Sequence, residues 1–291
     1  MHNKSKKKIL ILGISGMLGS SVFRYLQKNS SHFLLGTIRK KEKLKYFTET
    51  NQSSIKYDFD ALNDENIIKT LDVFKPDVVI NCIGVIKQVI SLPEEIIYFN
   101  SVCPRKLSSL CLNRNYRLIH FSTDCVFSGE KGNYVESDFP DANDLYGRSK
   151  LIGETDNNNV LTLRTSLIGH ELNSNLSLVD CFLSQKGSIT GFTNAIFSGL
   201  PTVYVAKILN EKIINSEISG IYHLSGPAVS KFDLLNQISI VYETNCLVER
   251  FDEFKINRSL NSDLLKAKLN IKVPNWPSLI KLMHEEFLMY A

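Results

Sequence analysis

Tyr146 and Lys150 stand four residues apart in the segment Tyr146-Gly147-Arg148-Ser149-Lys150. Residues four apart share one face of a helix, so a phenol and an ammonium would point the same way. Hydride addition to a ketone develops negative charge on oxygen, which a nearby O–H donor stabilises and then protonates. A phenol with an ordinary pKa of about 10 needs an adjacent cation to serve near neutral pH.

The position of this pair in the chain favours that chemistry over the alternative, a pair of ordinary helix-surface residues. The pair follows an apolar run over residues 117–121 and the polar turn Ser122-Thr123-Asp124. Asp144 is available to cap a helix that begins there. We therefore expect both side chains to face a cofactor that is held by the first turn of the chain.

That first turn reads Gly13-Ile14-Ser15-Gly16-Met17-Leu18-Gly19, with glycine at every third position. It lies directly between an apolar run and a segment of helical spacing. In a dinucleotide-binding turn, glycines permit the tight bend, the approach of backbone amides to a pyrophosphate, and close helix–strand packing. The helix N-terminus adds partial positive charge. The alternative is a plain tight turn; the predicted cofactor contacts here are Gly13, Ser15, Gly16, Met17, Leu18 and Gly19.

The end of the second predicted strand bears on the choice of cofactor. A carboxylate about 20 residues beyond the glycines would bond the ribose hydroxyl of NAD. Arg39 and Lys40 stand there instead, and a guanidinium binds a phosphate through two parallel hydrogen bonds. The sequence therefore favours NADPH over NADH; the alternative is that both cations only face solvent.

Two further strand ends complete the predicted cofactor site. Asp58 and Phe59 end the third strand, where the adenine would lie. Cys82, Ile83 and Gly84 end the fourth strand, on the nicotinamide side.

Apolar runs and helical spacings alternate along the first 165 residues. We expect strands over residues 9–12, 32–38, 54–59, 77–82 and 117–121, and helices over 17–28, 41–49, 63–74 and 93–113. Such alternation is typical of a parallel sheet covered on both faces. Right-handed crossovers then give an α/β fold, a doubly wound Rossmann-type domain.

This regularity ends at about residue 165. The segment 166–200 is rich in Ser, Asn and Gly, and shorter elements follow: helices over 203–213, 231–242 and 279–290 and a strand over 221–224. We expect a smaller α/β lobe over the carboxyl ends of the strands, where open sheets bind ligands. The predicted division is a basic tail over 1–8, an NAD(P)-binding domain over 9–165 and a substrate lobe over 166–291, with a soft boundary.

Composition excludes several classes of protein. With 43% hydrophobic and 22% charged residues in 291, the chain is an ordinary globular sequence. The net charge of +4 comes partly from the lysines of the tail. We interpret that tail as a solvated leader; the alternative is contact with an anionic partner, but nothing indicates a nucleic-acid binder.

Six cysteines without a Cys-x-x-Cys pair are expected to be reduced thiols of a cytoplasmic protein. No apolar stretch approaches the roughly 18 residues of a membrane span. The sequence contains neither a Gly-Lys phosphate loop nor a Gly-x-Ser-x-Gly elbow. The six histidines lack metal-ligand spacing, so no metal site is expected.

The sequence resembles the extended short-chain dehydrogenase/reductase superfamily, and within it the dTDP-4-dehydrorhamnose reductase group. The resemblance covers residues 8–165 well and the rest loosely. The segments that carry it are 13–19, 75–81, 122–127, 146–150 and 163–166.

The resemblance implies roles for individual residues. Tyr146 would donate the proton to a substrate carbonyl, Lys150 would hold the nicotinamide ribose and lower the pKa of the tyrosine, and Thr123 would hydrogen-bond the reacting oxygen. Asn100 matches a helix asparagine that supports proton relay. The substrate would contact Thr123, Asp124, Lys87 and Arg258, although an isolated arginine is also an ordinary surface charge. Relatives often dimerise through the helices that here span about 93–113 and 144–158, so a homodimer is expected.

The resemblance also narrows the activity. Related dehydratases carry Asp-Glu after the Ser-Thr, whereas Cys125 follows Asp124 here. We therefore expect NADPH-dependent reduction of the 4-keto group of a nucleotide-linked 4-keto-6-deoxy sugar for surface polysaccharide. Residues 196–198 depart from the family pattern, which leaves a dTDP-linked or a UDP-linked substrate open. The alternatives are a 4-epimerase with bound NAD and a non-enzymatic NADP-binding regulatory subunit.

Overall fold

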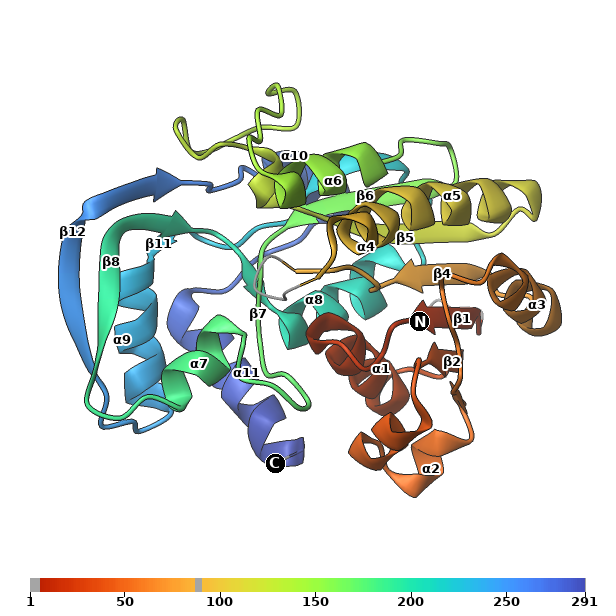
Figure 1. Cartoon of the computed structure of the whole chain (residues 1–291), viewed down its shortest axis with the longest axis horizontal. Coiled ribbons are helices and arrows are strands. Elements are labelled where there is room, and N and C mark those ends of the chain that lie inside the picture. The colour runs from red at the N-terminus through yellow and green to blue at the C-terminus, as the bar shows by residue number, and fades with distance from the viewer. Residues whose placement is uncertain (1–5, 87–90, 291) are drawn as a thin grey trace.

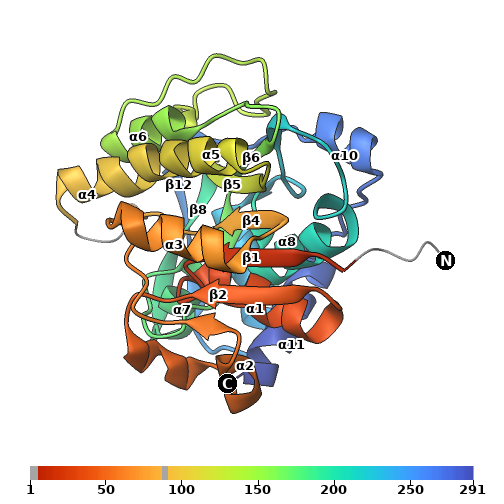
Figure 2. The same cartoon turned by 90° about the vertical axis from the view of Figure 1, so that its right-hand side faces the viewer.

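The computed structural model describes residues 6–86 and 91–290 of the chain, so Lys87, a predicted substrate contact, lies outside the described residues. Its centre is a seven-stranded sheet in the order β10-β6-β5-β4-β1-β2-β3, and every neighbouring pair is parallel (Figures 1 and 2). The strands are β1 (Lys8–Leu12), β2 (Phe33–Thr37), β3 (Ile55–Lys56), β4 (Val78–Asn81), β5 (Arg117–Thr123), β6 (Val160–Thr165) and β10 (Gly220–His223). This order confirms the doubly wound α/β fold.

Strand β1 shows why the central strands are continuously apolar. Ile9 and Ile11 belong to one hydrophobic cluster and Leu10 and Leu12 to the other, and all four are almost fully buried. A strand covered on both faces has no side free for polar residues.

Helices supply the cover on each face of the sheet. One face packs against α1 (Met17–Asn29), α8 (Thr202–Ile208) and α11 (Trp276–Tyr290). The other packs against α3 (Asp64–Phe74) and α5 (Cys103–Asn113) (Figure 2). No helix in the described part of the chain is both long enough and apolar enough to cross a membrane.

The region after β2 is less regular than expected. The predicted helix over 41–49 is a 3₁₀ helix, η1 (Lys41–Tyr46), followed by the single turn α2 (Glu49–Gln52). Neither contains a fully buried residue, and Leu44 and Tyr46 pack against the core only as partly buried side chains. Little packing is therefore available to stabilise a regular α-helix here. The third strand is only two residues long, and Asp58 beyond it has φ +56°, a left-handed conformation that ends the extended chain.

The long helix expected over 93–113 is interrupted by one widened turn. It consists of α4 (Pro93–Ile97), a π turn η2 (Tyr98–Val102) and α5. Pro104 has no amide hydrogen to donate to the carbonyl of Asn100, which removes an ordinary helical hydrogen bond there. Such widened turns occur frequently at functional sites.

The second half of the chain both completes the large sheet and forms a smaller one. Strand β10 pairs with β6, so the large sheet takes a strand from beyond residue 165. The smaller sheet has the order β11-β8-β12. Its strands are β11 (Val229–Ser230), β8 (Ser188–Phe197) and β12 (Leu247–Asn257), which pack against α9 (Lys231–Val241). The long strands β8 and β12 were not expected from the sequence.

Short elements connect the two parts. Strand β7 (Leu167–Ile168) follows β6 after one residue. It pairs in parallel with β9 (Leu200–Pro201) to form a two-stranded sheet. The helix α7 (Leu178–Leu183) follows β7, and α10 (Asp263–Leu269) follows β12.

Candidate functional site

The glycine turn joins β1 to α1, as the sequence predicts. Gly13 has φ +82°, a conformation that favours glycine. A Cβ on Gly19 would lie 2.2 Å from the carbonyl oxygen of Gly13, so only glycine lets α1 approach the strand this closely. The amide of Gly13 donates to Thr37 Oγ1 at 3.1 Å, which fixes the turn to the end of β2. Gly16 precedes α1 and has no side chain to cap it, so the first amides of the helix are available to an anionic group.

The remaining predicted cofactor residues lie at the same edge, where parallel strands end. Arg39 and Lys40 follow β2 and are both exposed. Phe59 is buried and its amide donates to the carbonyl of Ile38 at 3.1 Å, which joins the ends of the second and third strands, while Asp58 stays exposed.

The loop after β4 brings the glycine turn and the predicted catalytic lysine together. The Ile83 side chain lies against Gly13, 2.9 Å from where a Cβ would stand. A Cβ on Gly84 would lie 3.7 Å from Lys150 Nζ. Side chains and backbone from the first, fourth and fifth strand ends therefore meet in one region of the molecule.

Asn100, on the π turn, holds this loop in place. Its Oδ1 accepts from the amide of Val85, and its Nδ2 donates to the carbonyl of Val85, both at 3.0 Å. The Nδ2 also donates to Ser149 Oγ at 3.2 Å. The asparagine that the resemblance linked to proton relay thus uses its carboxamide to tie the loop after β4 to α6 (Leu145–Gly153).

Helix α6 presents Tyr146 and Lys150. Asp144 caps the helix by accepting from the amide of Gly147 at 2.7 Å, as expected. Lys150 is 7% exposed and its Nζ donates to the carbonyl of Phe121 at 2.6 Å. Burial lowers the pKa of Lys150 to about 8, although the negative charge of Glu154 opposes the shift.

Tyr146 meets Thr123 at the end of β5. Burial raises the pKa of Tyr146 above its ordinary value, and a side-chain hydrogen bond with Thr123 opposes this shift. The resemblance implied that the charge of Lys150 lowers the pKa of the tyrosine; this stays a prediction, and burial is the largest influence on Tyr146 here. Thr123 Oγ1 also donates to Asp124 Oδ1 and accepts from the amide of Cys125, each at 3.1 Å.

The turn after β5 also receives Arg258 from the smaller lobe. The Arg258 Nε donates to the carbonyl of Phe127 at 2.9 Å, and its Nη1 lies 3.7 Å from Cys125 Sγ. Burial raises the pKa of Asp124, while hydrogen bonding with Thr123 and the charge of Arg258 lower it. The structure therefore brings the predicted substrate residues Thr123, Asp124 and Arg258 to one place.

Sequence reasoning missed a buried charged pair beneath this site. Glu154 and Arg164 form it, with Ser122 as a third member. The available signal was the spacing of Glu154, four residues beyond Lys150 and eight beyond Tyr146, which continues the same helix face.

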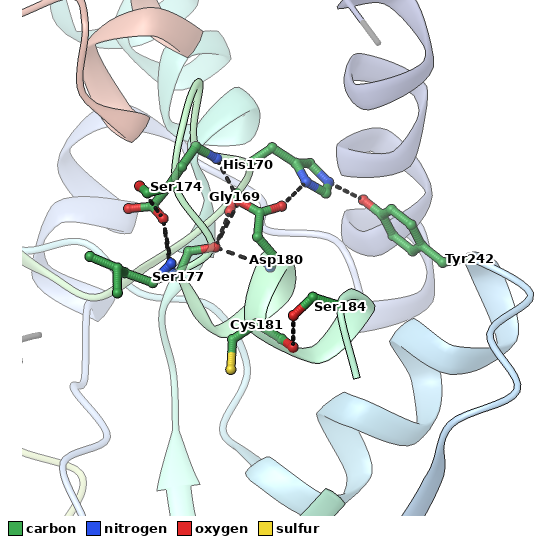
Figure 3. A network of polar contacts seen from close by, with 10 residues as sticks. Gly169, His170, Ser174, Ser177, Asp180, Cys181, Ser184 and Tyr242 are labelled. Atoms are coloured by element: carbon green, nitrogen blue, oxygen red, sulfur yellow. Dashed lines mark hydrogen bonds and ion pairs between the residues drawn. The ribbon is translucent and has the colours of Figure 1, made fainter. Parts of the chain in front are cut away.

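A second polar cluster lies in the segment after β6 (Figure 3). His170 Nδ1 lies 2.6 Å from Asp180 Oδ1, and its Nε2 lies 2.7 Å from the hydroxyl of Tyr242. Ser177 Oγ donates to the carbonyl of Gly169 at 3.1 Å. These contacts fasten the segment to α7 and to the end of α9, and they stand apart from Tyr146 and Lys150.

Two hollows lie in the smaller lobe and neither is lined by Tyr146 or Lys150. One of about 650 Å³ is lined by Thr193, Ser230, Asp233 and Trp276 among others. The other, of about 490 Å³, borders Tyr242. Over residues 6–86 and 91–290, no group of three or more His, Cys, Asp or Glu side chains could hold a metal ion.

The strand order, the glycine turn and the helix after β5 identify the class of protein as an extended short-chain dehydrogenase/reductase. The family model of the RmlD substrate binding domain matches residues 7–288. The chain belongs to this family.

The relatives include proteins named as reductases and proteins named as a subunit of methionine adenosyltransferase. A probable low-salt glycan biosynthesis reductase, Agl14, of Haloferax volcanii is 30% identical over 268 residues, which cover 87% of this chain and 84% of that protein. The dTDP-4-dehydrorhamnose reductase of Aggregatibacter actinomycetemcomitans is 31% identical, covering 78% and 76%. Methionine adenosyltransferase 2 subunit beta of Xenopus laevis is 28% identical, covering 76% and 67%.

Solved structures share the fold. The dTDP-4-dehydrorhamnose reductase of Bacillus anthracis, in complex with NADP, superposes with a TM-score of 0.80 at 19% identity, covering 98% of this chain and 99% of that one. The enzyme WbmG of Bordetella bronchiseptica, in complex with NAD and UDP, has a TM-score of 0.79 at 17% identity, covering 98% and 96%.

Proposed function

We propose that the protein is an NADPH-dependent reductase of the 4-keto group of a nucleotide-linked 4-keto-6-deoxy sugar, acting in surface polysaccharide synthesis. The observation that carries this proposal is the meeting of Tyr146 with Thr123 beside Lys150, at the sheet edge that also bears the glycine turn. The names of the reductase relatives support the same class of substrate.

The residues present fit a dinucleotide. The unhindered amides at the start of α1 suit a diphosphate, and the close packing at Gly19 keeps that helix start near the strand. Arg39 and Lys40 are exposed cations where an NAD-preferring site would carry a carboxylate, which supports a preference for the phosphate of NADPH. Bound NADPH would supply the hydride.

The chain itself supplies the proton and holds the carbonyl. Tyr146 is protonated at neutral pH, as an ordinary phenol is, and burial raises its pKa further. The protonated hydroxyl can donate to the carbonyl oxygen as negative charge develops there. The hydroxyl of Thr123 would turn from Asp124 Oδ1 to give the same oxygen a second hydrogen bond. Lys150, close to the loop after β4, is placed to bind a ribose hydroxyl.

Arg258 is the cation we assign to the substrate's diphosphate. Its guanidinium is half-buried and anchored through Nε, which leaves donors on its other nitrogens for an anion. Thr123 and Asp124, at the neighbouring turn, would then contact the sugar.

The test is NADPH oxidation measured against a panel of dTDP-linked and UDP-linked 4-keto-6-deoxy sugars. We expect turnover with at least one sugar, and none with the same sugar in the Tyr146→Phe variant. Absence of oxidation with every sugar, for a folded protein that binds NADPH, would exclude the reductase. A 4-epimerase would convert substrate while recycling bound NAD, without net consumption of NADPH.

The second candidate is a regulatory subunit that binds a dinucleotide without turning it over. The observation that favours it is the similarity to methionine adenosyltransferase 2 subunit beta. Copurification with a larger enzyme, together with no turnover on the panel, would support this function. The presence of Tyr146, Lys150 and Thr123 together at the end of β5 favours the reductase.

We also propose that two copies associate through the helices α4 to α6. Ile97 and Val102 before α5, and Leu145 and Ile152 on α6, are exposed apolar side chains on neighbouring elements.

A further inference from the structure

One face of α6 meets three consecutive residues at the end of β5. Tyr146 hydrogen-bonds with the side chain of Thr123. Lys150 Nζ donates to the carbonyl of Phe121 at 2.6 Å. One turn further on, Glu154 Oε1 accepts from Ser122 Oγ at 2.6 Å. Glu154 is therefore the third member of a row whose first two members are the proposed catalytic residues.

Glu154 is buried and is held on both carboxylate oxygens. Arg164 Nε donates to Oε1 and Arg164 Nη2 donates to Oε2, each at 2.8 Å. The two side chains are only 4% and 5% exposed. A buried charge is costly unless it is paired and hydrogen-bonded, and this two-pronged pairing also fixes the direction of the carboxylate.

Arg164 is itself fixed in the sheet. It lies on β6 directly opposite Ser122 of β5, its guanidinium stands over the Phe127 ring at 5.3 Å, and its Nη1 lies 3.4 Å from His223 Nε2. The carboxylate of Glu154 thus has one orientation, set by two neighbouring strands.

The groups that face Lys150 from the other elements are neutral at physiological pH. Burial raises the pKa of the Cys82 thiol, which follows β4, to about 12. Burial and the charge of Lys150 hold the pKa of His120, on β5, well below its ordinary value. Tyr146 is protonated at physiological pH, as an ordinary phenol is, and burial raises its pKa further. Glu154 is left as the anion that acts on Lys150.

We propose that Glu154 is a positioning residue for Lys150: fixed by Ser122 and Arg164 one helical turn beyond the lysine, its carboxylate supplies the negative charge that balances the buried ammonium at the end of β5. The importance of a charged Lys150 rests on the proposed function. Glu154 is assigned no contact with cofactor or substrate.

Two substitutions are expected to move the pKa of Lys150 in opposite directions. Burial already lowers the pKa of Lys150 to about 8. Glu154→Gln removes the anion that opposes this shift, so the pKa of Lys150 falls further. Arg164→Met removes a cation and leaves the anion, so the pKa of Lys150 rises.

The experiment is NMR of the protein labelled with ¹³C and ¹⁵N in lysine, in which the Cε and Nζ shifts of Lys150 are followed against pH. The Lys150→Met variant identifies the signal. We expect a lower midpoint in Glu154→Gln and a higher one in Arg164→Met. A purely structural pair would lower thermal stability in both variants without moving the midpoints in opposite directions. An unchanged midpoint in folded Glu154→Gln would overturn the proposal.

If a single variant does not fold, the double variant Glu154→Gln with Arg164→Gln replaces it, because it leaves no unpaired buried charge. Its midpoint should lie below that of the wild type, since the lost carboxylate is the charge that opposes the lowered pKa of Lys150; a midpoint at or above the wild-type value would overturn the proposal. These titrations need neither cofactor nor sugar, so they decide the role of Glu154 even if the sugar panel excludes the reductase. With an active sugar, the basic limb of kcat against pH should move to lower pH in Glu154→Gln.

Discussion

At the scale of single residues, the chemistry depends on where protons reside near neutral pH. Burial pushes the pKa of Tyr146 upward and that of Lys150 downward to about 8. A phenol is protonated near neutral pH even at its ordinary pKa, so the first shift leaves the proton in place and makes it harder to donate. The second brings the pKa of Lys150 close to neutral pH, so that neighbouring charges decide how much of the amine is protonated. The negative charge of Glu154 is one of these. The same desolvation thus has opposite consequences for an acid and for a base.

Replacing Tyr146 by Phe removes the proposed proton donor while preserving the ring. We expect kcat to fall by about 100-fold or more, the range that general acid catalysis contributes. NADPH affinity should change little, because the amides at the start of α1 and Arg39 are unaltered. Steady-state turnover and NADPH fluorescence titration check the two parts. Unreduced turnover in the variant would exclude Tyr146 as the donor.

Replacing Arg39 by Glu tests the assignment of the cofactor phosphate. Arg39 is exposed beyond β2, so the substitution should fold normally. A carboxylate there repels a phosphate, and we expect the Kd for NADPH to rise about 10-fold or more while that for NADH stays level or falls. Lys41→Glu on the same surface is the matched control, with a smaller effect. Equal changes for both cofactors would contradict the assignment.

At the scale of elements, the glycine turn depends on one contact between β1 and α1. Gly19→Ala would place a Cβ 2.2 Å from the Gly13 carbonyl oxygen. The helix must shift, so we expect a loss of about 1–3 kcal/mol in the free energy of unfolding, typical of overpacking, and a marked loss of NADPH affinity. Urea denaturation and cofactor titration measure these changes.

Gly16→Ala is the matched substitution in the same turn. A Cβ on Gly16 would meet the Gly13 carbonyl oxygen at 3.6 Å, an ordinary contact. We expect its stability to stay within about 1 kcal/mol of the wild type, the usual scale of a helix-cap change. Equal stability of the Gly19→Ala and Gly16→Ala variants would contradict the view that Gly19 is needed for the close approach of α1 to β1.

The sequence predicts those elements that local residues mark, through a run of buried apolar side chains or through a capping residue. The apolar run of β1 and the capped start of α6 are found where expected because each depends on local residues. Strand β12 could not be predicted, because eight of its eleven side chains are exposed, five of them charged, and its extended form comes from pairing with β8. The same limit applies to Glu154. Its spacing of four residues from Lys150 can be read in the sequence, but its ion pair with Arg164 exists only because the sheet places β6 beside β5.

At the scale of the whole molecule, the segment that carries Arg258 is fastened to the large sheet. The amide of Tyr134 donates to the carbonyl of Ser259 at 2.9 Å, and the amide of Asn261 donates to the carbonyl of Tyr134 at 2.7 Å. His223, on β10, lies within hydrogen-bond distance of the Tyr134 and Asn261 carbonyls through Nδ1. Arg258 therefore has a fixed position relative to Tyr146, although the two come from distant parts of the sequence.

The proposed dimer is tested at the centre of its apolar face. Ile152 on α6 is 55% exposed, and Ile97 and Val102 are exposed on α4 and η2, which pack against α6; a two-fold axis would bring this face against its own copy. We expect light scattering to give twice the chain mass for the wild type and a single chain mass for Ile152→Arg, because a desolvated guanidinium without a partner is costly. The control is Ile240→Arg, at a residue 76% exposed on α9, which should remain a dimer. A wild-type protein of single-chain mass at micromolar concentration would rule out this interface, and dissociation of both variants would place the contact elsewhere.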